Sequence, residues 1–213
     1  MFSGIKDFRQ RFSNEDREEV EKTISIESFS QLSTFTLHLL DPSEDAAPNF
    51  LSGLALRDFF KSCSEVLTTL HLKNVVLSED TFLMAVAMLP HLQSLVILDI
   101  YPDPYFTLQV ARRLSGHGHG VSKGILAELK HIEVDLLFNP ELQFSHFAEL
   151  VISRCNPVKA FCATPCCALQ AVSFPLRGAL IPDSELDQWK VFTADHLSVT
   201  LIDSSGIVNI SDD

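Results

Sequence analysis

The chain has 213 residues, of which 46% are hydrophobic and 21% are charged, a balance that excludes a disordered chain and is typical of a folded domain. Acidic residues outnumber Lys and Arg by 28 to 16, which gives a formal net charge of -12 at pH 7. Because phosphate backbones and anionic lipids repel such a chain, we expect neither nucleic acid nor a membrane surface as its partner.

The sequence also indicates a compartment. No basic segment followed by an apolar run opens the chain, and the longest apolar stretch, Phe82 to Leu89, is about half the length that spans a bilayer. Five cysteines, an odd number without framework spacing, fit a reducing environment. We therefore expect an intracellular protein, cytoplasmic or nuclear.

Residues 1–25 are rich in charge and carry few apolar residues. Asn14 is a candidate N-cap, because the acidic residues that follow it suit the positive end of a helix. We expect a helical lead-in over residues 1–25 that is mobile or loosely docked.

Between residues 26 and 195 two patterns alternate. The first is a strand-like phrase with apolar residues at positions 0, +3 and +5, the last two of which share one side of a strand. These phrases begin at Leu32, Leu67, Leu92, Leu129 and Leu169. The second pattern is a stretch with helical periodicity after each phrase. These stretches cover residues 49–64, 78–89, 104–114, 144–154 and 183–192.

The phrases start 35, 25, 37 and 40 residues apart, and a strand-plus-helix unit repeated in this way is typical of a repeat protein. We predict a single α/β domain over residues 26–195, a leucine-rich-repeat-like solenoid of about five units with parallel strands on its concave face and helices outside. An ordinary open α/β sheet is the alternative. The constant spacing of the phrases, and the lack of a Gly-rich turn between strand and helix, favour the solenoid.

Residues 196–213 differ from the rest. His196 to Ile202 alternates between polar and apolar residues, Asp203 to Gly206 has the composition of a turn, and a second apolar stretch precedes an acidic tail. We expect a terminal strand or hairpin that caps the core.

Residues 59–72 (FFKSCSEVLTTLHL) and 89–97 (LPHLQSLVI) resemble the leucine-rich-repeat region of fungal F-box proteins, especially the large basidiomycete families. Residues 149–154 (ELVISR) are similar to the end of a later helix in that family, and the resemblance covers roughly residues 26–178. It implies substrate recognition for a ubiquitin ligase. The family's F-box, which opens near "LPxE" and docks on a Skp-type adaptor, has no counterpart in residues 1–30, so we expect a truncated or repeat-only member that does not recruit this adaptor.

Three groups of residues invite a chemical interpretation. His117 to Gly120 offers only two of the three or more protein ligands that zinc needs, and it lies in a Gly-rich stretch. Glu133 and Asp135 share one side of a strand, as a solvated acidic stripe does. A cysteine group lacks the paired C-x2-C spacing of metal sites. Its members are Cys155, Cys162, Cys166 and Cys167. No phosphate-binding, dinucleotide or G-x-S-x-G motif occurs, so we predict no catalytic site, no metal and no cofactor.

The predicted solenoid instead offers a surface, because the residues between and beside the apolar positions of each phrase face the concave side in three rows. The first row holds Thr34, Thr69, Ser94, His131 and Ala171. The second row holds Thr36, His71, Val96, Glu133 and Ser173. The third row holds His38, Lys73, Leu98 and Asp135. All of these except Ala171 are the predicted partner-binding residues.

We therefore expect a protein–protein interaction module with an unidentified protein partner, related to the substrate-recognition part of F-box receptors. Two alternatives remain open. In the first, the chain is an open-sheet α/β enzyme whose active site has no recognisable sequence motif. In the second, it is a gene fragment without a selected activity.

Overall fold

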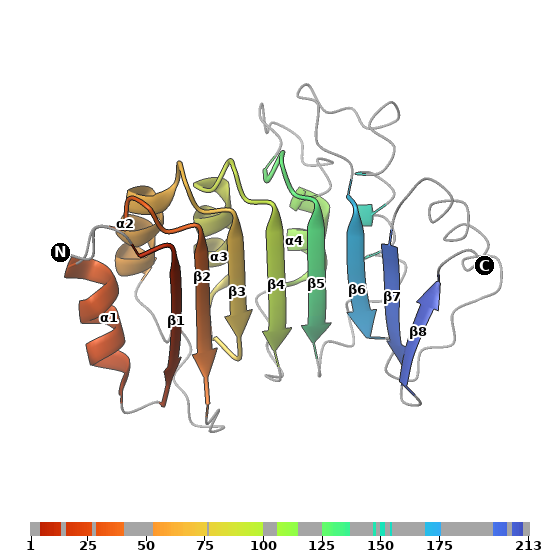
Figure 1. Cartoon of the computed structure of the whole chain (residues 1–213), viewed down its shortest axis with the longest axis horizontal. Coiled ribbons are helices and arrows are strands. Elements are labelled where there is room, and N and C mark those ends of the chain that lie inside the picture. The colour runs from red at the N-terminus through yellow and green to blue at the C-terminus, as the bar shows by residue number, and fades with distance from the viewer. Residues whose placement is uncertain are drawn as a thin grey trace.

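The computed structural model describes residues 5–13, 16–26, 29–40, 53–75, 77–99, 106–114, 125–136, 147, 150–151, 154, 169–175, 198–203 and 206–210. In these residues the chain has an α/β fold, in which one open sheet carries helices on one of its faces (Figure 1).

The strands of the sheet follow one another in sequence order. They are β1 (Asp7–Phe12), β2 (Thr34–Leu39), β3 (Thr69–Lys73), β4 (Ser94–Asp99), β5 (His131–Leu136), β6 (Ala171–Pro175), β7 (Ser198–Asp203) and β8 (Gly206–Ile210). Six parallel pairings join β1 to β7, and β8 pairs with β7 in the antiparallel direction. The order of these strands has no reversal, whereas doubly wound sheets bind their ligands at the point where the order reverses.

One pair of hydrogen bonds recurs at five successive steps along the sheet, from β1 to β6. The carbonyl oxygen before each strand accepts from two successive N–H groups at the start of the next strand, over 2.7–3.0 Å. The accepting residues are Lys6, Ser33, Thr68, Gln93 and Lys130. Because the same pair of bonds holds each step, the phrases stay in one register and their apolar residues lie side by side.

The core lies between this sheet and its helices. The apolar residues of the five phrases are all buried, with at most 8% of any one exposed. Phe35, Leu70 and Leu95, for example, occupy one row of adjacent strands, with no exposed surface on any of the three. The predicted stacking of the phrases in sequence order is confirmed.

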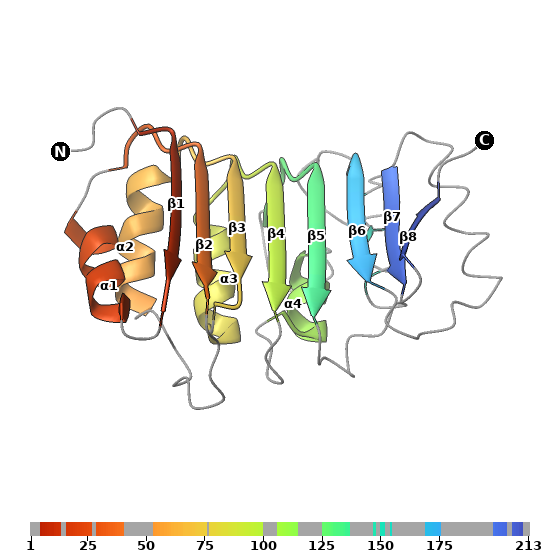
Figure 2. The same ribbon diagram turned by 60° about the horizontal axis from the view of Figure 1, so that its bottom comes forward.

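The helices are α1 (Arg17–Ile26), α2 (Gly53–Cys63), α3 (Glu79–Ala87) and α4 (Leu108–Leu114). Figures 1 and 2 show α2, α3 and α4 behind the sheet and α1 beside β1. The last three helices fall in stretches where the sequence predicts them. Ser78 caps α3 by accepting a hydrogen bond from the N–H of Thr81.

Only part of the later helical predictions can be compared with the structure. Phe147, Leu150, Val151 and Arg154 have helical conformation, in agreement with the stretch at 144–154. The stretch at 183–192 lies outside the described residues. None of the described helices is long and apolar enough to cross a membrane.

The prediction of a helical, loosely docked lead-in is wrong for its first part, because residues 7–12 form β1 and extend the sheet. Phe12 is completely buried, and α1 buries Val20 and Ile24. The strand escaped detection because polar Gln10 takes the place of the third apolar residue of a phrase whose first two positions are Ile5 and Phe8.

The start of α1 also differs from the prediction. The proposed cap Asn14 lies outside the described residues, and the helix begins at Arg17. Ahead of it, the backbone N–H and the hydroxyl of Ser13 both donate to the carboxylate of Asp16 at 2.8 Å. These bonds lower the pKa of Asp16, since they favour its charged form.

The terminal hairpin predicted within residues 196–213 is present as β7 and β8. Its first strand continues the parallel register, because Ser198 pairs with Ala171 and Thr200 pairs with Ser173. The antiparallel strand β8 then covers the edge of β7, which would otherwise expose unpaired backbone groups.

Candidate functional site

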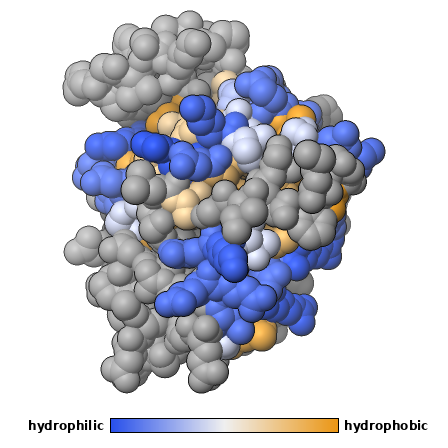
Figure 3. All heavy atoms as spheres, turned by 90° about the vertical axis from the view of Figure 1, so that its left-hand side faces the viewer, coloured by the Kyte–Doolittle hydropathy of each residue, from blue (hydrophilic) through white to orange (hydrophobic). Residues whose placement is uncertain are grey.

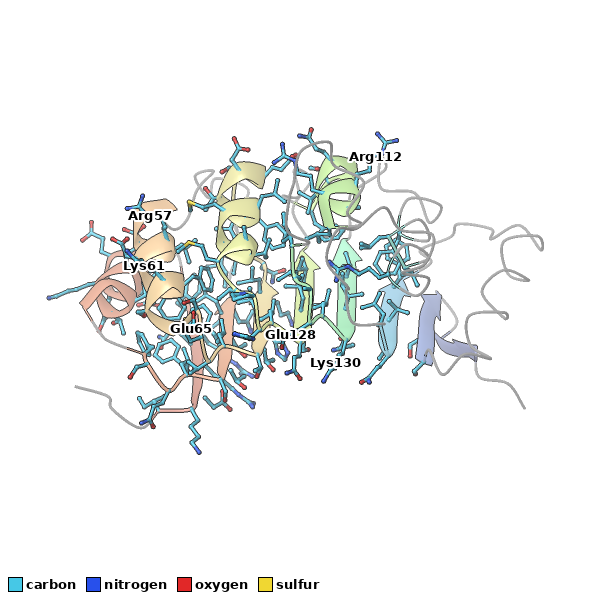
Figure 4. The ribbon with its side chains drawn as sticks, turned by 90° about the horizontal axis from the view of Figure 1, so that it is seen from above. Arg57, Lys61, Glu65, Arg112, Glu128 and Lys130 are labelled. Atoms are coloured by element: carbon cyan, nitrogen blue, oxygen red, sulfur yellow. The ribbon has the colours of Figure 1, made fainter. Side chains whose placement is uncertain are left out.

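The sheet face opposite the helices, which we call the open face, carries the residues that the sequence predicts as partner-binding. Figure 4 shows the sheet from above, with the helices on one side of the strands. The strand register confirms the three predicted rows, since Thr34 pairs with Thr69, and Thr69 with Ser94. Their role in binding stays a prediction.

β1 adds residues to these rows that the sequence analysis missed. Asp7 continues the first row, Arg9 the second and Arg11 the third, each paired in register with its neighbour on β2. All three are exposed. Figure 3 views the molecule from the β1 end, where hydrophilic side chains dominate the described surface. The sequence does carry a signal for this strand. It is the alternation of the charged residues Asp7, Arg9 and Arg11 with the aromatic residues Phe8 and Phe12.

The middle of the open face is apolar. Val96 is only 7% exposed, although it is not part of the main core, because His71 and Glu133 pair with it on either side. Leu98, two residues further along β4, is half-buried on the same face. Val96 therefore contributes less accessible surface than its place in the predicted row suggests.

Two histidines of the open face have altered acidity. Burial lowers the pKa of His38, and the positive charges of Lys73 and Arg11 lower it further. Burial also lowers the pKa of His71, against the opposing effect of Glu133. Both imidazoles are therefore biased toward the neutral form, which can donate and accept a hydrogen bond at once.

A third histidine of the open face, His131, forms a pair with Ser94 that resembles the nucleophile and general base of an enzyme. Ser94 Oγ and His131 Nδ1 lie 2.9 Å apart on adjacent strands. A nucleophilic serine also needs N–H donors for the developing oxyanion. The backbone N–H groups of Ser94 and His131 instead donate to the carbonyls of Thr68 and Gln93 at 2.9 Å within the sheet. These two N–H groups are therefore not available to stabilise an oxyanion.

A separate polar cluster lies at the end of the sheet where the strands begin. His91 Nδ1 lies 2.9 Å from Glu128 Oε1, and His91 Nε2 lies 3.8 Å from Glu65 Oε2. Nearby, Lys130 Nζ donates to Gln93 Oε1 at 3.3 Å. Glu65 precedes β3, whereas Glu128 and Lys130 both precede β5 (Figure 4). His91 and Gln93 precede β4, the strand between them. These contacts tie neighbouring turns together.

Other chemical candidates can be placed only in part. In the described part of the chain, no three His, Cys, Asp or Glu residues are arranged to hold a metal ion. Glu133 and Asp135 lie on the open face of β5, as predicted. The histidines of 117–120 and the cysteines at 155, 162, 166 and 167 lie outside the described residues.

Cys63, the one described cysteine, is a buried free thiol at the end of α2. Burial raises its pKa to about 12, and its Sγ donates to the carbonyl of Phe59 over 3.4 Å. Because the thiolate is the reactive form, this residue serves packing rather than chemistry.

Comparison with known proteins gave no match, neither a protein family, nor a curated protein, nor a solved structure. The fold places the chain in the α/β class.

Proposed function

We propose that the chain is a leucine-rich-repeat-type solenoid whose open face binds another protein inside the cell. The observation that carries this proposal is the single register over β1 to β7, which lines up side chains from seven strands in continuous rows. Curved solenoids use such rows as extended contact surfaces.

The composition of the strands supports the solenoid over the open-sheet enzyme. Parallel strands covered by helices on both faces are nearly continuous apolar runs. β2 and β3 instead alternate between buried apolar and half-buried polar residues, as in Thr34 to Leu39. A sheet of this composition keeps one face for the core and leaves the other available to a partner.

The size of the open face indicates the kind of partner. Six steps of about 4.8 Å across the strands and four residues of about 3.3 Å along them give a projected area of about 400 Å². A standard interface buries about 800 Å² on each partner. A segment of a protein, held in a transient contact, therefore fits this face better than a large permanent interface.

The resemblance of residues 59–72 and 89–97 to fungal F-box receptors gives the proposal its more specific form, recognition of a protein substrate. Recruitment of a Skp-type adaptor is not part of it.

Site-specific photo-crosslinking tests the proposal. A photoreactive amino acid replaces Thr36 or Ser173, both half-buried on the open face, in tagged protein expressed in its own cells. The matched controls carry it at Ala87 on α3 or Arg113 on α4, which are exposed on the helical side. We expect a protein adduct from the open-face positions and none from the controls. Adducts from the helical side alone contradict the proposal, and cullin-type ligase subunits that co-purify would support its specific form.

A further inference from the structure

In the second and third rows of the open face, the charges are ordered from one end of the sheet to the other. In the third row, β1 to β3 contribute Arg11, His38 and Lys73, β4 contributes Leu98, and β5 contributes Asp135. The second row repeats this order. It runs through Arg9, Thr36, His71, Val96 and Glu133. The third row thus passes from the cations Arg11 and Lys73 through apolar Leu98 to anionic Asp135. The second row follows the same direction more weakly, because Arg9 is paired with Asp7 and His71 is biased toward its neutral form.

The cationic end of the third row is a strip in which Arg11 and Lys73 flank His38, an imidazole biased toward its neutral form. Arg11 pairs in register with His38, and His38 with Lys73, so their side chains start about 4.8 Å apart. The charges of Lys73 and Arg11 act on the imidazole between them. A concentrated positive strip is unexpected in a chain whose net charge is -12.

This strip is not neutralised within the described part of the chain. Asp7, the acidic residue on the same strand as Arg11, is bound by Arg9, with Nη2 and Oδ2 2.9 Å apart. Elsewhere in the described part of the chain, Arg57 on α2 and His91 before β4 form ion pairs. Arg11 and Lys73 are both exposed and so stay accessible to an external carboxylate.

We propose that the open face binds an extended segment of a partner protein that crosses the strands with acidic residues over β1 to β3, an apolar residue against Val96 and Leu98, and a basic residue at Glu133 and Asp135. This inference rests on the proposed function and specifies the partner that the face accepts. Charge complementarity selects this occupant, because a segment with its charges in mixed order would place like charges together at one end or both.

The strand spacing sets the spacing of the segment. β2, the centre of the cationic strip, lies about 10 Å from β4, which equals about three residues of an extended chain. β5 lies a further ~5 Å away, or one to two residues. The segment therefore has an acidic group, an apolar residue about three positions on, and a basic residue within the next two.

Fluorescence anisotropy with synthetic peptides tests this inference. The probe is a labelled peptide with the order acidic, apolar, basic, and its control has the same composition with acidic and basic residues alternating. We expect the ordered peptide to bind about tenfold more tightly, with an affinity that falls as salt rises. Equal affinity of the two peptides overturns the inference.

Charge reversal on the protein gives the second arm. Arg11→Glu combined with Lys73→Glu should weaken binding of the ordered peptide about tenfold, whereas Arg57→Glu combined with Lys61→Glu on α2 should leave it within about twofold. Arg57 and Lys61 carry the same charge but lie on the helical side (Figure 4). A peptide whose acidic residues are replaced by lysines should bind the first variant better than the wild type, which also shows that this variant is folded.

The outcomes separate this inference from the proposed function. If a partner crosslinks from Thr36 equally well in the wild type and in the Arg11→Glu, Lys73→Glu variant, the charge order is irrelevant and the inference fails while the proposed function stands. Loss of that crosslink in this variant, with retention in the Arg57→Glu, Lys61→Glu variant, supports the inference.

Discussion

Arg154 donates to backbone carbonyls from two separate segments although it is only 3% exposed. Its Nε and Nη2 reach the carbonyl of Leu114 at 3.0 and 2.8 Å, and its Nη1 reaches that of Leu126 at 2.7 Å. Leu114 is the last residue of α4, where a positive charge also meets the negative end of the helix. Leu126 has a φ of 57°, a conformation that costs a non-glycine residue about 1–2 kcal/mol. The guanidinium therefore joins a helix end to a strained turn before β5.

We expect Arg154→Met to lower the free energy of unfolding by about 3 kcal/mol, because buried carbonyls lose their donor. Arg154→Lys should recover only part of this loss, since an ammonium cannot span carbonyls that a planar fork reaches together. Urea denaturation measures both values. Arg113→Lys, an exposed change on α4, is the control and should shift the midpoint little. Equal stability of Arg154→Met and the wild type would show that these bonds contribute nothing net.

His71 makes the stability of the fold depend on pH. Its pKa in the folded protein is lowered, first by burial, and Glu133 opposes that effect. His131 and Arg9 lower it further, and Asp7 raises it. Since the unfolded chain titrates near the ordinary value of about 6.5, it takes up the proton more readily than the folded chain does. The contribution of His71 to stability is therefore full above about pH 6.5 and is lost as the pH falls toward the folded pKa.

His71→Gln should consequently flatten the decline in the free energy of unfolding between about pH 7.5 and about pH 5.5. Urea titrations at a series of pH values measure this slope. Ser173→Ala, a change in the same row that removes no titrating group, should keep the slope of the wild type. A slope that is the same with and without the imidazole contradicts the assignment.

At the scale of the elements, apolar spacing predicts strands well where all three positions of a phrase are apolar. β2 to β6 carry such phrases, and the predicted rows follow because side chains alternate along a strand. β1 escaped prediction because its phrase has a polar third residue, which an edge strand tolerates since it lacks a neighbour on one side. The spacing of apolar residues indicates which positions of a strand are buried, and an edge strand buries fewer of its side chains than a central strand does.

The same omission hid the charge order of the open face. The rows read from β2 to β6 contain three histidines, one lysine and two acids, which looks like a mixed polar surface. Only the register of β1 places Arg9 and Arg11 at the end of the rows and makes the gradient apparent. Likewise the role of Arg154 depends on carbonyls 28 and 40 residues away, which no local pattern encodes.

At the scale of the whole molecule, each described strand between the two edges of the sheet is hydrogen-bonded to the strand before it and the strand after it. The first end of the sheet is held by an aromatic cluster, in which Phe35 lies 4.4 Å from Phe59 of α2 and 5.7 Å from Phe8 of β1, measured between ring centroids. The other end is closed by the antiparallel pairing of β7 with β8. In such an array, stability is approximately a sum of unit terms and nearest-neighbour terms.

This nearest-neighbour arrangement predicts how far the effect of a destabilising substitution extends along the sheet. Leu95→Ala removes a fully buried side chain of β4 that pairs in register with Leu70 and Ile132, so it should cost about 3 kcal/mol and increase amide hydrogen exchange in β3, β4 and β5. Phe8→Ala acts at the edge, where the ring contacts Phe29 and Phe35, and should increase exchange in β1 and its neighbour β2 but not in β5. Hydrogen exchange with mass spectrometry resolves these segments. A uniform increase in all strands after Phe8→Ala would mean that the sheet opens as one cooperative core, because an array coupled only through neighbours confines an edge defect to its edge.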